Sequence, residues 1–216
     1  MMLRYITIAI VLLLSFNLAV AQDEAAIRKV VERLTSGGYV KGEFKQQRQL
    51  RGIAKAITSQ GRFVVWRKHG FYWDTVTPIF QAISFSNGKI YQWQDATTVA
   101  IVQESSFNVQ RRASALILAF FTADFDRLQQ DFQISWQFTG KQWSASLVPH
   151  NMYIKKALEK VTLSGDKYIE SVRLEATAGD ITRIRLSVTA EGDEPNQLDR
   201  NKIDSEIIAA CCLKRK

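Results

Sequence analysis

The sequence predicts an α+β fold in which helices cover a long, curled antiparallel sheet. Short strand-like segments, separated by Gly, Pro and Asn-Gly turns, occupy residues 39–103 and 132–190. Segments of helical periodicity lie before, between and after these two runs. Helices that serve a single sheet indicate a layered α+β arrangement, and a long twisted antiparallel sheet tends to curl. A curled sheet covered by helices encloses a space.

The first 21 residues have the three-part form of a secretory signal peptide. Arg4 supplies the positive start, residues 6–14 are almost entirely apolar, and the small residues 19–21 (Ala-Val-Ala) suit a cleavage site. The apolar stretch is shorter than the roughly 20 residues that a spanning helix needs. We therefore expect cleavage after residue 21, a single domain formed by residues 22–216, and a periplasmic location. A lipid-anchoring Cys is missing at the predicted first mature position.

Residues 23–35 predict the first helix of the mature chain. An apolar stripe recurs there at the spacing of one helical face, at Ile27, Val30, Val31 and Leu34. Asp23 can cap its start, and Gly37-Gly38 ends it. The stripe should cover the strands that follow.

Six strands are predicted next, at residues 39–50, 57–67, 71–76, 80–85, 89–94 and 97–103. The second has two apolar faces, because Phe63 and Val65 alternate with Val64 and Trp66. Asn-Gly at residues 87–88, between two alternating segments, is a strong hairpin signal.

The middle of the chain changes to helical spacing. Residues 111–122 predict a helix that buries most of its surface, with Ala and Leu on several faces and few charges. Residues 126–131 predict a short second helix, and Asp124 with Asp126 suits a helix cap.

The second run of strands is predicted at residues 132–139, 142–148, 160–164, 168–176 and 181–190, with residues 152–160 fitting either a strand or a helix. In the last of these strands Ile184, Leu186 and Val188 alternate with Arg and Ser, which indicates one buried and one wet face. A final helix is predicted at residues 197–210. The total is about ten strands.

The charge of the chain predicts a solvated surface more than a nucleic-acid site. Lys and Arg number 29 against 21 Asp and Glu, a formal net charge of +8. The basic residues are scattered through the strands, and export argues against nucleic acid. Anionic lipid head groups are the remaining alternative. The only cysteines, Cys211 and Cys212, are adjacent and form no disulfide scaffold, so we expect no functional role for them and a monomeric protein.

The sequence predicts no enzyme, cofactor or metal site. His69 and His150 are the only histidines, and neither has a Cys or a second His at ligand spacing. A G-x-S-x-G motif is absent, and Ser144 and Ser146 have no nearby base.

Three motifs follow one another within residues 37–93. The first is G-x-F-x-Q at 42–46, and the second is a Gly-started strand, an Arg-containing turn and an aromatic strand, GRFVVWRKHGFYW at 61–73. The third is P-x-x-Q-x-I with a later Gly and aromatic residues, at Pro78, Gln81, Ile83, Gly88, Tyr91 and Trp93. In this order, and behind a signal peptide, they resemble the LolA-like family of periplasmic carriers of outer-membrane lipoproteins. The departures in spacing indicate a divergent member.

The resemblance implies an unclosed β-barrel with helices as a lid over a hydrophobic cavity for acyl chains. It implies an acylated lipoprotein or another lipid as cargo, an inner-membrane donor complex and an outer-membrane acceptor. It also implies that Arg67, at the turn after the Gly-started strand, bonds to the lid and holds it shut. The family usually has Pro after this Arg, where the present chain has Lys68.

The predicted cavity walls are aromatic and aliphatic side chains, which bind acyl chains without fixed geometry. They are Phe44, Phe63, Val65, Phe71, Trp73, Ile83, Phe85, Tyr91, Trp93, Leu116 and Phe120. Any one of these aromatic residues also fits an ordinary core. The predicted function is a periplasmic carrier that delivers acyl chains towards the outer membrane. The alternative is a periplasmic lipid or lipoprotein sensor, or an interaction module, that uses the same sheet.

Overall fold

A computed structural model describes residues 24–67, 69–86, 89–93, 99–101, 119–120 and 122–203. Several predicted features lie outside the described residues: the signal peptide at 1–21, the Asn-Gly turn at 87–88, most of the helix at 111–122 including Leu116, the end of the last helix, Lys68, Cys211 and Cys212.

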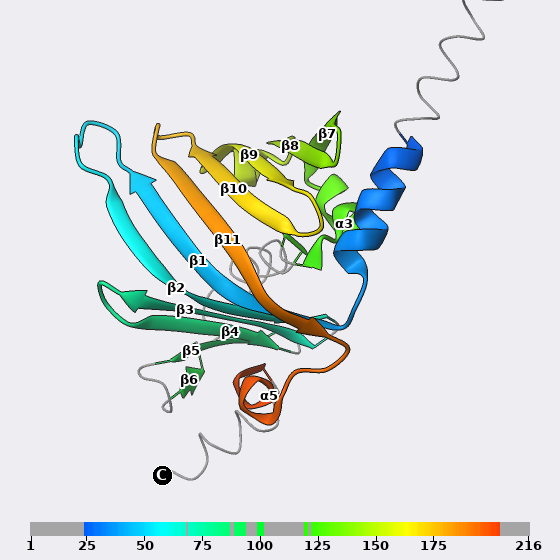
Figure 1. The fold of residues 1–216 in the computed structure, drawn as a ribbon. Coiled ribbons are helices and arrows are strands. Elements are labelled where there is room, and N and C mark those ends of the chain that lie inside the picture. Colours follow the sequence, from blue (N-terminus) through cyan, green and yellow to red (C-terminus); the bar gives the residue numbers. More distant parts are fainter. Residues whose placement is uncertain are drawn as a thin grey trace, which may run out of the picture.

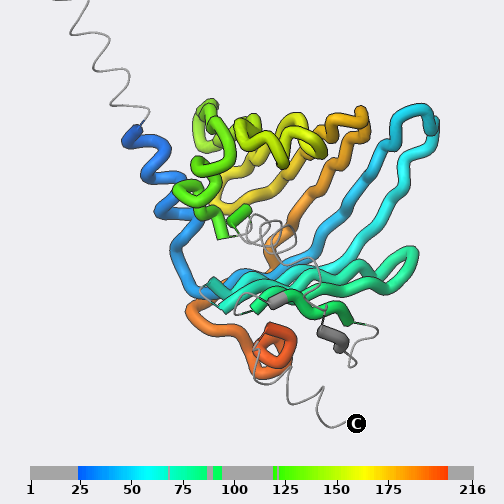
Figure 2. The backbone as a smooth tube through the Cα atoms, turned by 180° about the vertical axis from the view of Figure 1, so that it is seen from behind, coloured from blue at the N-terminus to red at the C-terminus, as the bar shows by residue number. Residues whose placement is uncertain are grey.

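Eleven strands form one antiparallel sheet in the order β6-β5-β4-β3-β2-β1-β11-β10-β9-β8-β7. The first run comprises β1 (Tyr39–Gln49), β2 (Ile57–Trp66), β3 (Gly70–Thr77), β4 (Gln81–Ser86), β5 (Lys89–Trp93) and β6 (Val99–Ile101). The second run comprises β7 (Phe132–Thr139), β8 (Gln142–Pro149), β9 (Leu158–Gly165), β10 (Ile169–Ala176) and β11 (Ile181–Gly192). Because β6 and β7 form the two edges, the sheet curls without closing (Figures 1 and 2), which confirms the predicted fold class.

The pairing of β1 with β11 joins the two runs. It extends from Gln49 opposite Ile181 to Tyr39 opposite Gly192, with an irregularity between Lys41 and Gly42. Along β11 the predicted alternation is confirmed, since Arg183, Arg185, Ser187 and Thr189 are exposed, whereas Ile184, Leu186 and Val188 are buried or half-buried.

Helices lie on both faces of the sheet. Residues 24–35 form the predicted first helix, followed by α3 (Phe125–Gln129), α4 (Met152–Lys155) and α5 (Gln197–Ile203). Asp124 caps α3 by accepting a hydrogen bond from the Arg127 amide at 3.0 Å. The ambiguous segment 152–160 divides into α4 and the start of β9. None of the helices in the described ranges has the length and apolar character needed to cross a membrane.

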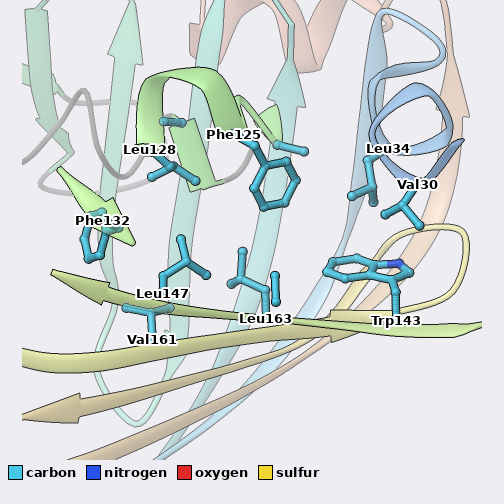
Figure 3. Close-up of a cluster of buried hydrophobic side chains, with 12 residues drawn as sticks. Val30, Leu34, Phe125, Leu128, Phe132, Trp143, Leu147, Val161 and Leu163 are labelled. Atoms are coloured by element: carbon cyan, nitrogen blue, oxygen red, sulfur yellow. The ribbon is translucent and has the colours of Figure 1, made fainter. Parts of the chain in front are cut away.

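The concave face of the second run is packed by helices. Val30 and Leu34 of the first helix lie over Trp143 of β8, while Phe125 and Leu128 of α3 lie over β8 and β9 (Figure 3). We call this the helix-covered cluster; its buried residues are Val30, Leu34, Ala119, Ala123, Phe125, Leu128, Phe132, Trp143, Ala145, Leu147, Val161 and Leu163.

Two further clusters lie on opposite faces of the first run. The concave aromatic cluster consists of Val40, Phe44, Phe63, Val65, Phe71, Phe85 and Leu186. The convex cluster, beneath α5, consists of Tyr39, Val64, Trp66, Tyr72, Ala82, Tyr91, Trp93 and Ile203. The two apolar faces predicted for β2 therefore belong to two different cores.

Candidate ligand-binding cavity

A cavity of about 310 Å³ lies between the helix-covered cluster and the concave aromatic cluster. Its size is at the lower end of the range of about 300–1,000 Å³ that is usual for small-molecule sites. Its lining consists of Leu34, Val40, Gln46, Phe63, Val65, Arg67, Phe71, Trp73, Ile83, Phe120, Ala123, Val161, Leu163, Tyr168, Ile169, Val172, Leu174, Ile184, Leu186 and Val188.

Six of the predicted wall residues lie in this lining: Phe63, Val65, Phe71, Trp73, Ile83 and Phe120. Five of them come from three neighbouring strands. The β2–β3 register sets Phe63 opposite Trp73 and Val65 opposite Phe71, and the β3–β4 register sets Trp73 opposite Ile83. Side chains opposite one another in an antiparallel pair share a face. The strand alternation therefore gathers these residues on the concave side.

Phe44 and Phe85 belong to the concave aromatic cluster and stack on wall residues, but they are not part of the lining. Phe44 is stacked on Trp73 with ring centroids 3.8 Å apart, and Phe85 is stacked on Phe71 at 6.0 Å. The Gly of the first motif allows a close approach of β11 and of the Phe63 ring, because a methyl group at Gly42 would lie 2.1 Å from the Ser187 carbonyl oxygen and 2.8 Å from that ring. The motif thus has a packing reason.

Tyr91 and Trp93 are wrongly placed by the sequence prediction, since they lie on the convex face. The β4–β5 register sets Tyr91 opposite Ser84 and Trp93 opposite Ala82. Trp93 donates its indole N–H to the Ser84 hydroxyl at 2.9 Å, in the core that α5 covers. Aromatic content alone could not assign the face, because both faces of these strands are buried.

The second half of the lining comes from strands that the sequence prediction did not assign to the cavity. Val161 and Leu163 of β9, Val172 and Leu174 of β10, and Ile184, Leu186 and Val188 of β11 face the aromatic wall. The alternation along residues 181–190 marks a buried face, but only the pairing of β1 with β11 brings that face to the cavity.

Arg67 lies where the sheet meets the first helix. Its guanidinium donates to the Leu34 carbonyl and, at 3.5 Å, to the Gly37 carbonyl. Its own amide donates to the Gly38 carbonyl at 2.8 Å. Burial lowers the pKa of Arg67, and the nearby Tyr168 opposes this shift. Its Nε is buried and has no hydrogen-bond partner among the described residues.

The chemistry of the lining is that of a binding site for apolar groups. Three of its described residues carry a charged, amide or hydroxyl group: Arg67, Gln46 and Tyr168. The Tyr168 hydroxyl is already bonded to Glu191. Throughout the described ranges, His, Cys, Asp and Glu do not gather in any group of three or more that could hold a metal ion.

A family model described as outer membrane lipoprotein carrier protein LolA matches residues 38–197. No curated protein matches the chain. Among solved structures, the chain is similar to a DUF1329 family protein from Desulfovibrio piger, at 10% identity over 86% of this chain and 96% of that chain, with a TM-score of 0.48. It is similar to lipoprotein LppX of Mycobacterium tuberculosis, at 10% identity over 81% and 97% of the two chains, with a TM-score of 0.45. It is also similar to a LolA superfamily protein of Nitrosomonas europaea, at 9% identity over 82% and 96%, with a TM-score of 0.44.

Proposed function

The chain belongs to the family of the outer membrane lipoprotein carrier protein LolA, and from that membership we propose that it carries acyl chains in its cavity. The observation that supports this most is the apolar cavity between two separately packed cores. Each buried CH₂ group of a ligand contributes about 0.8 kcal/mol. An acyl chain can therefore be held there without a polar contact.

The proposed setting is the periplasm, reached through cleavage after residue 21. The cargo is an acylated lipoprotein or another lipid, accepted from an inner-membrane donor and passed to an outer-membrane acceptor. The proposed action is binding and release without catalysis or a cofactor.

The proposed lid is the first helix together with the segment that carries Phe120 and Ala123. Leu34, Phe120 and Ala123 contribute to the lining, so a displacement of these elements would enlarge or open the cavity. Arg67 would hold the lid in place through the Leu34 carbonyl of the helix and the Gly37 carbonyl just after it.

Uptake of an apolar fluorescent probe, followed by its displacement with fatty acids, tests the cavity. We expect the delipidated protein to bind the probe, and Ile184→Asn to weaken binding about tenfold because an unpaired amide would face the acyl chain. Arg183→Asn is the matched control, since Arg183 is its exposed neighbour on the other face of β11. A folded, delipidated protein that binds no probe would contradict the proposal.

Transfer of a labelled acylated cargo between donor and acceptor vesicles tests the carrier role separately. We expect transfer to be faster with the protein than without it. Binding without any transfer would leave a sensor or interaction module as the better description.

A further inference from the structure

Within the described residues, four connections lie along one rim of the sheet: residues 50–56 between β1 and β2, 78–80 between β3 and β4, 150–157 between β8 and β9, and 177–180 between β10 and β11. Antiparallel pairing brings these turns to the same end of the sheet, away from the first helix (Figures 1 and 2). That helix is held at the opposite end, where Arg33 pairs with Asp166 between β9 and β10 at 3.0 Å. We call the four connections the turn rim.

Exposed apolar side chains concentrate at the turn rim. The described residues include eight exposed large hydrophobic side chains, of which seven lie in these connections or within two residues of them: Ile53, Ile57, Val76, Ile79, Val148, Met152 and Tyr153. Ile79 is 70% exposed and Tyr153 is 68% exposed. The eighth, Leu198, is also 68% exposed but lies in α5 on the convex side. This distribution makes the two ends of the sheet chemically different.

The charged groups of the turn rim are mainly cationic. Arg51, Lys55, Lys155 and Lys156 lie in the four connections, and Asp180 is the one carboxylate within them. Asp180 is already engaged, since it accepts hydrogen bonds from the Arg51 amide at 3.0 Å and from Arg48 at 3.2 Å. Lys55, Lys155 and Lys156 are all exposed. The turn rim therefore carries a net positive charge beside its exposed apolar side chains.

Three acidic residues lie just outside the connections: Asp131 before β7, the exposed Glu159 in β9, and Glu175 in β10, which accepts a hydrogen bond from Arg173 at 3.2 Å. Asp131, just before β7, accepts a hydrogen bond from the Asn151 amide at 2.7 Å. This contact fixes the start of α4. Lys155 and Lys156, at the other end of that helix, form no salt bridge among the described residues. Lys156 lies above the Tyr153 ring, 6.0 Å from its centroid.

The cavity lining extends towards this rim. On β1 the lining reaches Gln46, three residues before the strand ends at Gln49, which corresponds to about 10 Å of extended chain. On β3 and β11 it reaches Trp73 and Ile184, each within four residues of the strand end at the rim.

We propose that the turn rim docks the protein on an anionic lipid bilayer. Ile53, Ile79, Met152 and Tyr153 enter the boundary between head groups and acyl chains, and the neighbouring lysines and Arg51 meet lipid phosphates. Tyr suits this position because it has an apolar ring and a polar tip.

The distribution of the apolar residues favours a bilayer over a protein partner. They come in twos and threes from three of the four turns, at Ile53 with Ile57, Val76 with Ile79, and Val148 with Met152 and Tyr153, and cationic residues lie among them. A protein interface needs a packed, shape-complementary core, whereas fluid lipid accommodates small separate groups of side chains. Docking by the rim would bring the cavity close to the lipid from which an acyl chain leaves or into which it enters.

Vesicle flotation tests whether the turn rim binds lipid. The experiment uses exported protein from which the predicted signal peptide has been cleaved. We expect binding to phosphatidylcholine vesicles that contain phosphatidylglycerol, weaker binding to phosphatidylcholine alone, and loss of binding at high salt. The variant Ile79→Asp with Tyr153→Asp should lower the bound fraction about tenfold. Leu198→Asp is the matched control, because Leu198 is equally exposed on another face.

A second pair of variants tests the charge. Lys155→Gln with Lys156→Gln should weaken binding to anionic vesicles, whereas Arg183→Gln with Arg185→Gln, on the convex face of β11, should not. Unchanged flotation of both rim variants, a stronger effect of the convex variants, or a rim-dependent dimer in solution would each overturn the inference. Probe binding by the rim variants should stay normal, so failure of docking and failure of the cavity proposal are distinguishable.

Discussion

At the scale of single residues, Arg67 connects the sheet to the first helix. The last carbonyls of a helix have no partner within it and carry the negative end of its dipole. Arg67 donates to one such carbonyl, that of Leu34, and to the carbonyl of Gly37 just after the helix. Lys could not satisfy both with the same fixed fork. The contact therefore depends on the shape of the guanidinium as well as on its charge.

Arg67→Leu should slow the release of cargo more than it changes binding. Each hydrogen bond to a charged group contributes about 1.5–3 kcal/mol, so its loss should favour the loaded state with the lid displaced. We expect roughly tenfold slower transfer of a labelled acylated cargo to acceptor vesicles. Arg67→Lys, which keeps the charge, should give an intermediate rate. Equal transfer rates in equally stable proteins would make Arg67 a structural turn residue only.

At the scale of elements, α5 explains why the first run of strands is apolar on both faces. Ile203 is fully buried against β3 and β4, and Asp199 accepts hydrogen bonds from the Tyr39 hydroxyl at 3.1 Å and from Lys41 at 2.9 Å. Tyr72, in the same layer, donates to the buried Asp74 at 3.3 Å. The helix thus covers a convex core that contains polar groups, while the concave side remains available for a ligand.

Alkaline pH should weaken the convex core. Burial raises the pKa of Tyr39 and of Tyr72 above the ordinary 10.0, and the hydrogen bond to Asp199 raises the pKa of Lys41 above 10.5. Groups whose folded pKa is raised contribute stability that is complete below the unfolded pKa and is lost as the pH rises further. The free energy of unfolding should therefore fall above about pH 10.

Urea unfolding at about pH 8 and about pH 11 measures this decline. Tyr72→Phe keeps the ring and removes the titrating hydroxyl, so its stability should fall less steeply over the same interval. An identical decline in the variant would show that Tyr72 does not contribute to it.

At the scale of the whole molecule, the chain builds separate cores and leaves the space between two of them unfilled. The helix-covered cluster and the concave aromatic cluster face one another across the cavity. Apolar walls without partner atoms lose dispersion contacts, so the empty cavity is less stable than a filled one. A ligand that binds only the folded state should raise stability by mass action.

Val188→Phe should fill part of the cavity and raise the free energy of unfolding of the empty protein by about 1 kcal/mol. The same change should reduce the increase in Tm that a fatty acid produces in the wild type. Ser187→Phe adds the same ring on the exposed face of β11 and should leave that increase intact. A full ligand-induced increase in Val188→Phe would place the bound acyl chain elsewhere.

The sequence by itself determined the local elements. Alternation and turn residues predicted β7 at residues 132–139, and helical spacing predicted the first helix and α3. Helices and strands depend on neighbours within a few residues along the chain, so local pattern is sufficient to find them. The donor role of Arg67 was implied only by the family resemblance, because its contacts with the Leu34 and Gly37 carbonyls join residues 30 or more positions apart.

The tertiary structure alone decided which faces meet. Tyr91 and Trp93 are aromatic, like the residues of the cavity wall, yet the register of their strand places them under α5. Conversely, Val172 and Ile184 line the cavity because β11 pairs with a strand more than 130 residues earlier in the chain. A strand that is apolar on both sides fits either face equally well, and only long-range pairing and the covering helix distinguish core from cavity.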